Sequence, residues 1–204
     1  MLKKYGITCL ILISSYLPFG SASAVMIGFS PSSITVNVGD TFDVDVVISD
    51  LFASSEIVSA FDLDVTYDAA ILNATAVSFG SYLDDAFGLS LQDAEFTLGR
   101  IDFSELSFLS DSYLLAIQPD SFTLATMSFE ALAAGVSSLF FDPNTLPGVS
   151  VIGLASLDLS ASIGTGDVRV AAIKVAEPSI LFVMITALLG FAITQRKRFK
   201  ILTS

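Results

Sequence analysis

The middle of the chain is dominated by an alternation of apolar residues with polar or acidic ones. Apolar side chains occupy every second position in 34–38, 42–48 and 61–67, and four carboxylates lie between them: Asp43, Asp45, Asp62 and Asp64. A period of two places the apolar side chains on one face of a β-strand and the polar ones on the other. Because a buried unpaired carboxylate is costly, we expect the acidic faces to contact water. The pattern favours antiparallel strands that are each buried on one face.

Further short strands are predicted along the rest of this region. Two flank a Gly99-Arg100 turn, at 94–98 and 101–106, and others are expected at 121–132, 135–141, 149–154, 157–163 and 168–173. The segment 82–91, rich in Asp and Gly, is expected to be a loop. About eight to ten short strands with almost no helix indicate an all-β fold, an antiparallel β-sandwich or jelly roll.

Two local irregularities are also predicted. The apolar positions of 121–132 change parity near Ala125-Thr126, which indicates a β-bulge there. Ser110 or Asp111 is suited to cap a short helical turn at 112–117, which Pro119 would end.

The first 24 residues have the pattern of a secretory signal peptide. Lys3 and Lys4 precede an apolar segment, 6–17, and Ala22-Ser23-Ala24 supplies small residues for cleavage. We therefore expect export by Sec-type machinery and cleavage at this Ala22–Ala24 triplet. Cleavage after Ala24 would remove the single cysteine, Cys9, so the mature chain must fold without disulfides.

The C-terminal residues predict a membrane segment. An apolar run at 180–193, broken only by Thr186, is followed by a basic cluster. The run is shorter than the ~20 residues that usually cross a bilayer, but with its flanks it could span a locally thinned membrane. We expect a hydrophobic helix at about 179–195, with the basic residues on the cytoplasmic side.

This C-terminal pattern resembles the PEP-CTERM sorting signal of exported bacterial proteins. The residues that carry the resemblance are Glu177, Pro178, Ser179, Arg196, Lys197 and Arg198. Ala176 stands where the family's first proline usually lies, and six residues follow the basic block. The resemblance implies recognition by an exosortase, and it leaves open whether the tail is cleaved or remains as a membrane anchor.

The composition excludes several classes of function. The chain has no histidine, so Ser-His and Cys-His nucleophile systems and histidine-based zinc sites are excluded. Between residues 25 and 176 only three basic residues accompany twenty acidic ones, a net charge of −17. A domain this acidic repels nucleic acid. No cofactor is expected, apart from a possible calcium ion.

The calcium hypothesis depends on strand order. If the strands that carry Asp43, Asp45, Asp62 and Asp64 are neighbours, four like charges share one face and destabilise the sheet. A bound Ca²⁺ would relieve that repulsion. If the strands are not adjacent, the four carboxylates are simply solvated.

Two tyrosines are candidates for ligand contacts. The chain has no tryptophan for stacking on sugars, and Tyr82 and Tyr113 lie in segments expected to be exposed. Tyr67 ends an alternating row and is expected in the core. A glycoside hydrolase built on two carboxylates is one alternative function.

The middle of the chain resembles the cohesin-type domain found in PEP-CTERM proteins. Three stretches carry the resemblance, at 38–44, 60–68 and 122–135. The resemblance implies a jelly roll of about nine strands, and cohesins bind dockerin modules. Carbohydrate binding, with exopolysaccharide as the ligand, is another alternative function that the resemblance implies. The expected organisation is a signal peptide at 1–24, a cohesin-like sandwich at 25–174 and a sorting signal at 175–204.

These observations predict an exported, non-catalytic protein of the cell envelope or extracellular matrix. It would be membrane-anchored through its C-terminal helix, or released to the cell surface or medium after sorting. Its expected role is binding or scaffolding, with another envelope protein or an extracellular polysaccharide as partner.

Overall fold

The computed structural model describes residues 24–84, 88–143, 149–172, 184–188 and 191. The chain divides into two compact units, Met1–Ala171 and Ala172–Ser204. In the second unit the described residues 184–188 are helical. Within the described residues, no helix has the length and apolar character needed to cross a membrane. Most of the helix expected at 179–195 lies outside the described residues.

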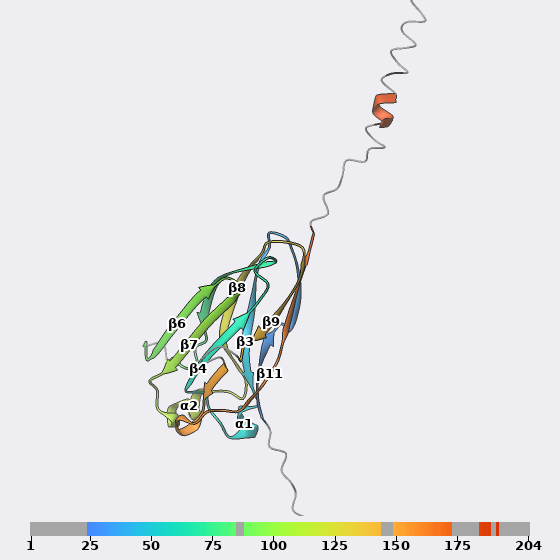
Figure 1. Cartoon of the computed structure of the whole chain (residues 1–204). Helices are drawn as coiled ribbons and strands as arrows, with labels where there is room; N and C mark the ends of the chain where they lie inside the picture. Colours follow the sequence, from blue (N-terminus) through green and yellow to red (C-terminus); the bar gives the residue numbers. More distant parts are fainter. Residues whose placement is uncertain (1–23, 85–87, 144–148, 173–183, 189–190, 192–204) are drawn as a thin grey trace, which may run out of the picture. The chain divides into compact units, whose positions relative to one another are not determined.

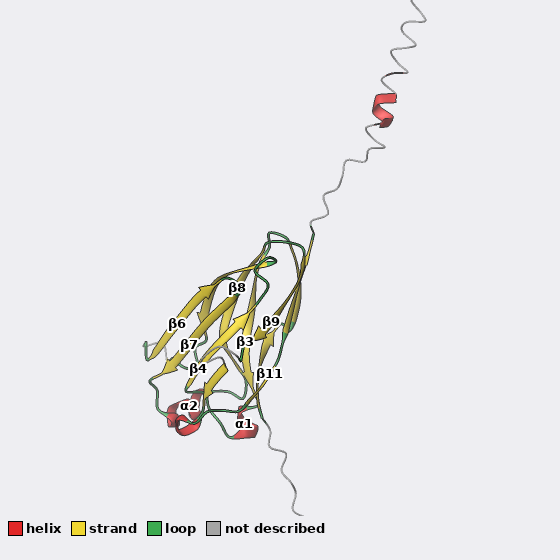
Figure 2. Cartoon of the chain, in the orientation of Figure 1, coloured by secondary structure: helices red, strands yellow, loops and turns green. Residues whose placement is uncertain are grey.

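The first unit consists of two β-sheets packed face to face (Figure 1, Figure 2). One sheet has the order β11 (Ala161–Ile163), β1 (Val25–Ser30), β3 (Thr41–Ser49), β8 (Phe122–Ala131), β5 (Leu72–Phe79). The other has the order β2 (Ser33–Asn37), β12 (Gly166–Ala171), β9 (Gly135–Phe141), β4 (Ala60–Thr66), β7 (Arg100–Ser107), β6 (Ser90–Thr97). Strand β10 (Val149–Ile152) pairs with the first part of β4, on the same edge of β4 whose last residues pair with β9. The prediction of an all-β sandwich is confirmed.

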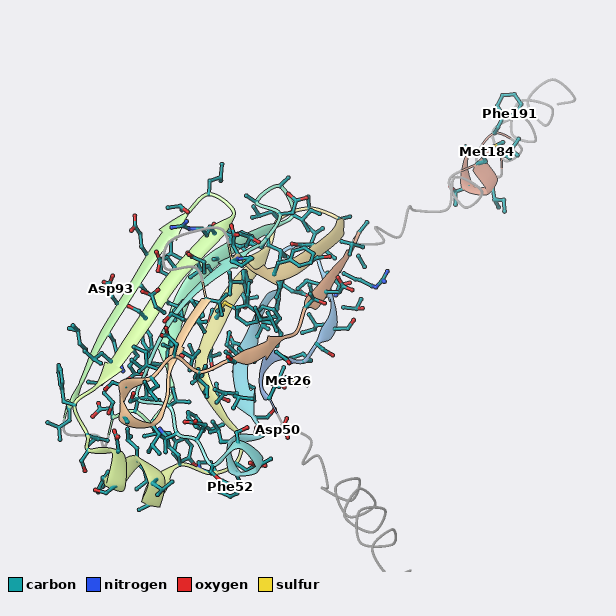
Figure 3. The ribbon with its side chains drawn as sticks, turned by 60° about the horizontal axis from the view of Figure 1, so that its bottom comes forward. Met26, Asp50, Phe52, Asp93, Met184 and Phe191 are labelled. Carbon is teal, nitrogen blue, oxygen red and sulfur yellow. The ribbon has the colours of Figure 1, made fainter. Side chains whose placement is uncertain are left out.

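Three short helical segments lie between the strands. They are α1 (Leu51–Ser54), α2 (Asp111–Ile117) and the 3-10 helix η1 (Leu154–Ser156). Helices α1 and α2 lie at the same end of the sandwich, where Asp50 and Phe52 are also found (Figure 3).

The described residues form twelve strands where about nine were expected, in part because the chain crosses between the sheets from β1 to β2 and from β11 to β12. Pro31 cannot donate a ladder hydrogen bond, and there the chain crosses from β1 in one sheet to β2 in the other. Strands β1–β11 and β2–β12 pair in parallel, so the expectation of purely antiparallel pairing was wrong at these edges.

Some strand boundaries also differ from the prediction. Strands β1 and β5 were not predicted, and β6 begins at Ser90, within the segment expected to be a loop. The strand expected at 157–163 is formed only from Ala161 onward. Ala155 and Ser156, both with a φ of 57°, turn the chain before it.

The predicted irregularities are confirmed to within about one residue. The register between β3 and β8 shifts where Val46 pairs with Ala125 and Val47 with Thr123, which places a bulge at Leu124. The β6–β7 hairpin turns through Leu98 and Gly99, one residue earlier than expected, and Gly99 has a φ of +79°. Ser110 is the N-cap residue of α2.

Aromatic side chains from both sheets fill the core. Phe129 of β8 is fully buried and contacts Phe42 of β3 and Tyr67, with ring centroids 5.6 and 5.4 Å apart. Phe29 of β1 stacks on Phe141 of β9 with centroids 4.4 Å apart, which joins the two sheets. Tyr67 packs in this layer, as its place in the alternating row predicted.

One carboxylate lies on the inner side of the sandwich. Glu105 has the same strand parity as the core residues Ile101 and Phe103, and only 1% of its surface is exposed. Its Oε1 accepts a hydrogen bond from Gln92 Nε2 at 2.8 Å, whereas its Oε2 has no hydrogen-bond partner. Burial raises the pKa of Glu105, and the nearby polar side chains of Gln92 and Ser90 oppose that rise.

Replacing Phe129 with alanine tests the aromatic core. We expect Phe129→Ala to lower the free energy of unfolding by about 3–5 kcal/mol, because it leaves a cavity between the sheets. Phe140→Ala on β9 is the matched control, since 49% of Phe140 is exposed and its loss should cost well under half as much. Urea unfolding measures both; equal effects would contradict the assigned core.

Glu105 gives a pH-dependent prediction. Its pKa is higher in the folded than in the unfolded chain, so the contribution of Glu105 to stability is present below the unfolded pKa and is lost as the pH rises through the folded pKa. Glu105→Gln keeps an acceptor for Gln92 and removes the buried charge, so it should stabilise the fold by about 1–2 kcal/mol at pH 7. The gain should disappear near pH 4. Urea unfolding at several pH values measures it, with Glu130→Gln on β8 of the other sheet as control; a destabilised Glu105→Gln at pH 7 would refute the assignment.

Candidate binding face

The outer face of β10, β4, β7 and β6 gathers five carboxylates. Across β4 and β7, Asp64 is opposite Asp102 and Asp62 is opposite Ser104. Across β7 and β6, Glu95 is opposite Asp102 and Asp93 is opposite Ser104. Directly opposite residues in antiparallel strands share a face, so the five acidic side chains form one patch. We call this surface the acidic face.

Within the acidic face, one carboxylate is buried. Only 1% of Asp64 is exposed, which corrects the expectation that all four predicted carboxylates contact water. Arg100 of β7 covers it, with Nε 3.2 Å from Asp64 Oδ1 and Nη2 3.4 Å from Asp102 Oδ2. The burial is possible because the charge is paired.

The remaining carboxylates repel one another. Burial raises the pKa of Asp62, and the charges of Asp102, Asp64 and Asp93 raise it further. Burial also raises the pKa of Asp102, as do Asp64, Glu95 and Asp93, and Arg100 opposes that rise. A positively charged partner would therefore be attracted to this face.

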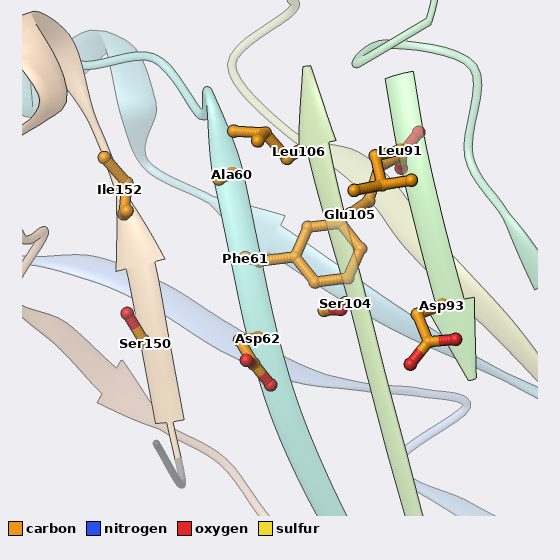
Figure 4. Close-up of a pocket in the computed structure, with 10 residues that line it drawn as sticks. All are labelled: Ala60, Phe61, Asp62, Leu91, Asp93, Ser104, Glu105, Leu106, Ser150 and Ile152. Atoms are coloured by element: carbon orange, nitrogen blue, oxygen red, sulfur yellow. The ribbon is translucent and has the colours of Figure 1, made fainter. Parts of the chain in front are cut away.

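An apolar hollow adjoins the acidic patch (Figure 4). It has a volume of about 310 Å³ and crosses β10, β4, β7 and β6. Its apolar lining includes Ile152, Leu106 and Leu91, of which Leu106 is 44% and Leu91 62% exposed. Asp62 and Asp93 also line it. The face thus combines exposed aliphatic side chains with carboxylates, as protein-binding surfaces do.

The other two predicted carboxylates lie in the opposite sheet. Asp43 and Asp45 are on β3, where their Oδ1 atoms accept hydrogen bonds from Ser128 at 2.7 Å and from Thr126 at 2.6 Å. The four predicted acids therefore do not share a face, and the condition for the calcium hypothesis is not met. Among the described residues, no group of three or more potential metal ligands is assembled.

The two candidate tyrosines have different environments. Tyr82 is half-buried, and its ring packs against Phe122 with centroids 5.0 Å apart, so it belongs to the edge of the core. Tyr113 is on α2 and 45% of it is exposed.

The predicted processing residues lie mostly outside the described residues. This applies to Ala22 of the cleavage site and to all six sorting residues, Glu177, Pro178, Ser179, Arg196, Lys197 and Arg198. Ala24 is described and is exposed immediately before β1.

Most of the acidic face was not identified from the sequence. Glu95 and Asp102 belong to the strands predicted at 94–98 and 101–106, and Asp93 lies just before the first of them, but these strands had not been placed beside β4. The signal was available in part, because paired strands joined by a two-residue turn have a defined register. The predicted turn at Gly99-Arg100 would pair Glu95 with Ser104, and only the observed turn at Leu98 and Gly99 places Glu95 opposite Asp102.

The Asp64–Arg100 pair predicts a specific loss of stability. Arg100→Ala would remove the guanidinium that pairs with the buried Asp64, and removing one member of a fully buried pair costs about 3–5 kcal/mol. We expect about 2 kcal/mol here, because the Arg100 side chain is 31% exposed and water can partly replace it. Arg169→Ala, at an exposed position of β12, should change stability by less than about 0.5 kcal/mol. Chemical denaturation of both variants tests the pair, and indistinguishable midpoints would contradict it.

Several solved structures have a similar fold. A type II cohesin domain from the cellulosome of Acetivibrio cellulolyticus is 22% identical with a TM-score of 0.58, covering 72% of this chain and 95% of its own. A type I cohesin–dockerin complex from Clostridium thermocellum gives 14% identity and a TM-score of 0.56, with coverage of 73% and 100%. The seventh ScaB type I cohesin from Pseudobacteroides cellulosolvens is 19% identical with a TM-score of 0.56. The match covers 76% of this chain and 96% of that cohesin.

The family is established by sequence. No curated protein matches the chain. The sequence model of the cohesin domain matches residues 27–153, most of the sandwich. Cohesin domains are non-catalytic scaffolding modules, which confirms the prediction that the protein is not an enzyme. The chain belongs to the cohesin domain family.

Proposed function

We propose that this protein is a scaffolding module that binds a dockerin-type protein partner through the acidic face. The observation that carries the proposal is the apolar hollow beside the carboxylates, with Leu91 and Leu106 exposed on a regular sheet. Two similar structures are cohesins in complex with dockerins, which supports a partner of this kind.

The chemistry of the face indicates what the partner must present. Aliphatic side chains would fill the hollow along Ile152, Leu106 and Leu91 and displace water from it. Lysine or arginine side chains would meet Asp62, Asp93 and Asp102, whose mutual repulsion a cation relieves. Affinity should therefore weaken with added salt. It should also weaken as the pH falls through the raised pKa values of Asp62 and Asp102, because their charge is then lost.

Variants on the two outer faces test this proposal. Against a panel of purified type I and type II dockerin modules, we expect Leu106→Ala and Asp62→Asn each to weaken binding about tenfold, about 1.4 kcal/mol. Asp43→Asn on the opposite sheet is the matched control and should bind like the parent chain. Isothermal titration calorimetry gives the dissociation constants. Parent-like binding by both variants, or no binding to any dockerin by the parent chain, would reject the proposal.

We also propose that the protein acts outside the cytoplasm, in the cell envelope or the extracellular matrix. The support is the signal-peptide pattern at 1–24 and the resemblance of 175–204 to a PEP-CTERM signal. Sec-type machinery would export the chain and an exosortase would sort it. The dockerin-type partner is then another envelope protein.

A further inference from the structure

The folded domain begins directly after the expected cleavage triplet. Val25 is the first residue of β1, with 1% of its surface exposed, and it pairs with Ala161 of β11. Met26 pairs with Ser49 of β3. Ala24 is exposed and belongs to no strand. The first described strand therefore begins at the residue that cleavage after Ala24 would expose.

A cavity of about 340 Å³ lies at this first residue. Its lining consists of Ala24, Val25, Ser54, Glu56, Asp158, Leu159 and Ser160. The cavity is at the end of the domain where Met26, Asp50 and Phe52 lie close together (Figure 3). Two carboxylates thus share a cavity with the start of β1, and no basic residue lines it.

Nothing in the described structure neutralises these two carboxylates. Glu56 Oε2 accepts a hydrogen bond from the Leu154 N–H at 3.1 Å, and the Asp158 side chain makes no hydrogen bond or ion pair with a described residue. The described residues include two cations. Arg100 is paired with Asp64, and Arg169 is exposed on β12.

Cleavage after Ala24 would place a cation in the cavity. Hydrolysis of the Ala24–Val25 peptide bond consumes one water, leaves a carboxylate on Ala24 and creates an ammonium on Val25. We propose that the α-ammonium of Val25 binds between Glu56 and Asp158, so that removal of the leader completes an ion-pair site built into the fold. This inference rests on the proposed export of the chain.

Such a site would tie the start of β1 to the segment that joins β10 to β11. Glu56 Oε2 already accepts from Leu154, and Asp158 forms a backbone bridge with Ile152 at the end of β10. The pairing of β1 with β11 extends over only three residues. An ion pair at Val25 would therefore hold a short edge ladder together, in a domain without disulfides.

The amine of the processed protein tests the site. The full chain is expressed in an exporting bacterial host, and the exported protein is sequenced from its N-terminus; we expect Val25. Its α-amine is then labelled by reductive ¹³C-methylation and titrated by NMR. We expect a pKa about one unit above the ordinary value of about 7.7–8.0, since nearby carboxylates favour the ammonium.

Matched variants separate the outcomes. Glu56→Gln and Asp158→Asn should each return the Val25 pKa toward its ordinary value, and Glu95→Gln on the other sheet should leave it unchanged. Asp158→Asn is the cleaner variant, because the Asp158 side chain has no hydrogen bond or ion pair with a described residue to lose. An N-terminus at Val25 with an ordinary pKa that no variant changes would overturn the ion-pair site and leave export standing. A chain that is not exported, or that starts elsewhere, would overturn both.

Discussion

The structure depends on the burial of one face of every long strand in a single apolar layer. Phe129 and Phe42 from one sheet, with Phe103 and Phe61 from the other, form that layer, and they are held without a disulfide. Apolar burial of this kind is the main favourable term in folding. Because one face of each long strand is buried in this core, a surface that binds a partner must be on an outer face, at an edge or in a loop.

The two outer faces differ in how their carboxylates are satisfied. On the β3–β8 side, Asp43 and Asp45 accept short hydrogen bonds from Ser128 and Thr126 across the strands. On the β4–β7–β6 side, Asp62, Asp93 and Glu95 lie near other carboxylates and beside exposed leucines. On the first face Asp43 and Asp45 are paired with hydroxyl groups of the same sheet, whereas the second face has charge and apolar surface that a partner can neutralise and cover. This difference is the physical basis for assigning the binding face.

Several features were predictable from the residues because they depend on short-range rules. The alternation around Asp43 and Asp62 identified strands that are buried on one side, and the parity change near Ala125 located the bulge to within about one residue. Other features could not be predicted, because they depend on contacts between strands that are far apart in the sequence. The burial of Asp64 depends on Arg100, which is brought beside it only by the β4–β7 pairing. Glu105 is polar, but its position in the alternation of β7 places it on the inner face of the sheet, and this burial raises its pKa.

The sequence by itself determined the fold class, the absence of histidine chemistry and of a disulfide within the chain, and the acidity of the domain, since composition and a period of two are local properties. It also gave the expectation of export, through the patterns at its two ends. Only the tertiary structure decided which carboxylates meet. Asp43 and Asp62 look equivalent along the chain, but they lie in different sheets, because strand order is set by which apolar faces pack together over the whole domain. For the same reason, only the folded chain brings Glu56 and Asp158, about a hundred residues apart in the sequence, to the first residue of β1.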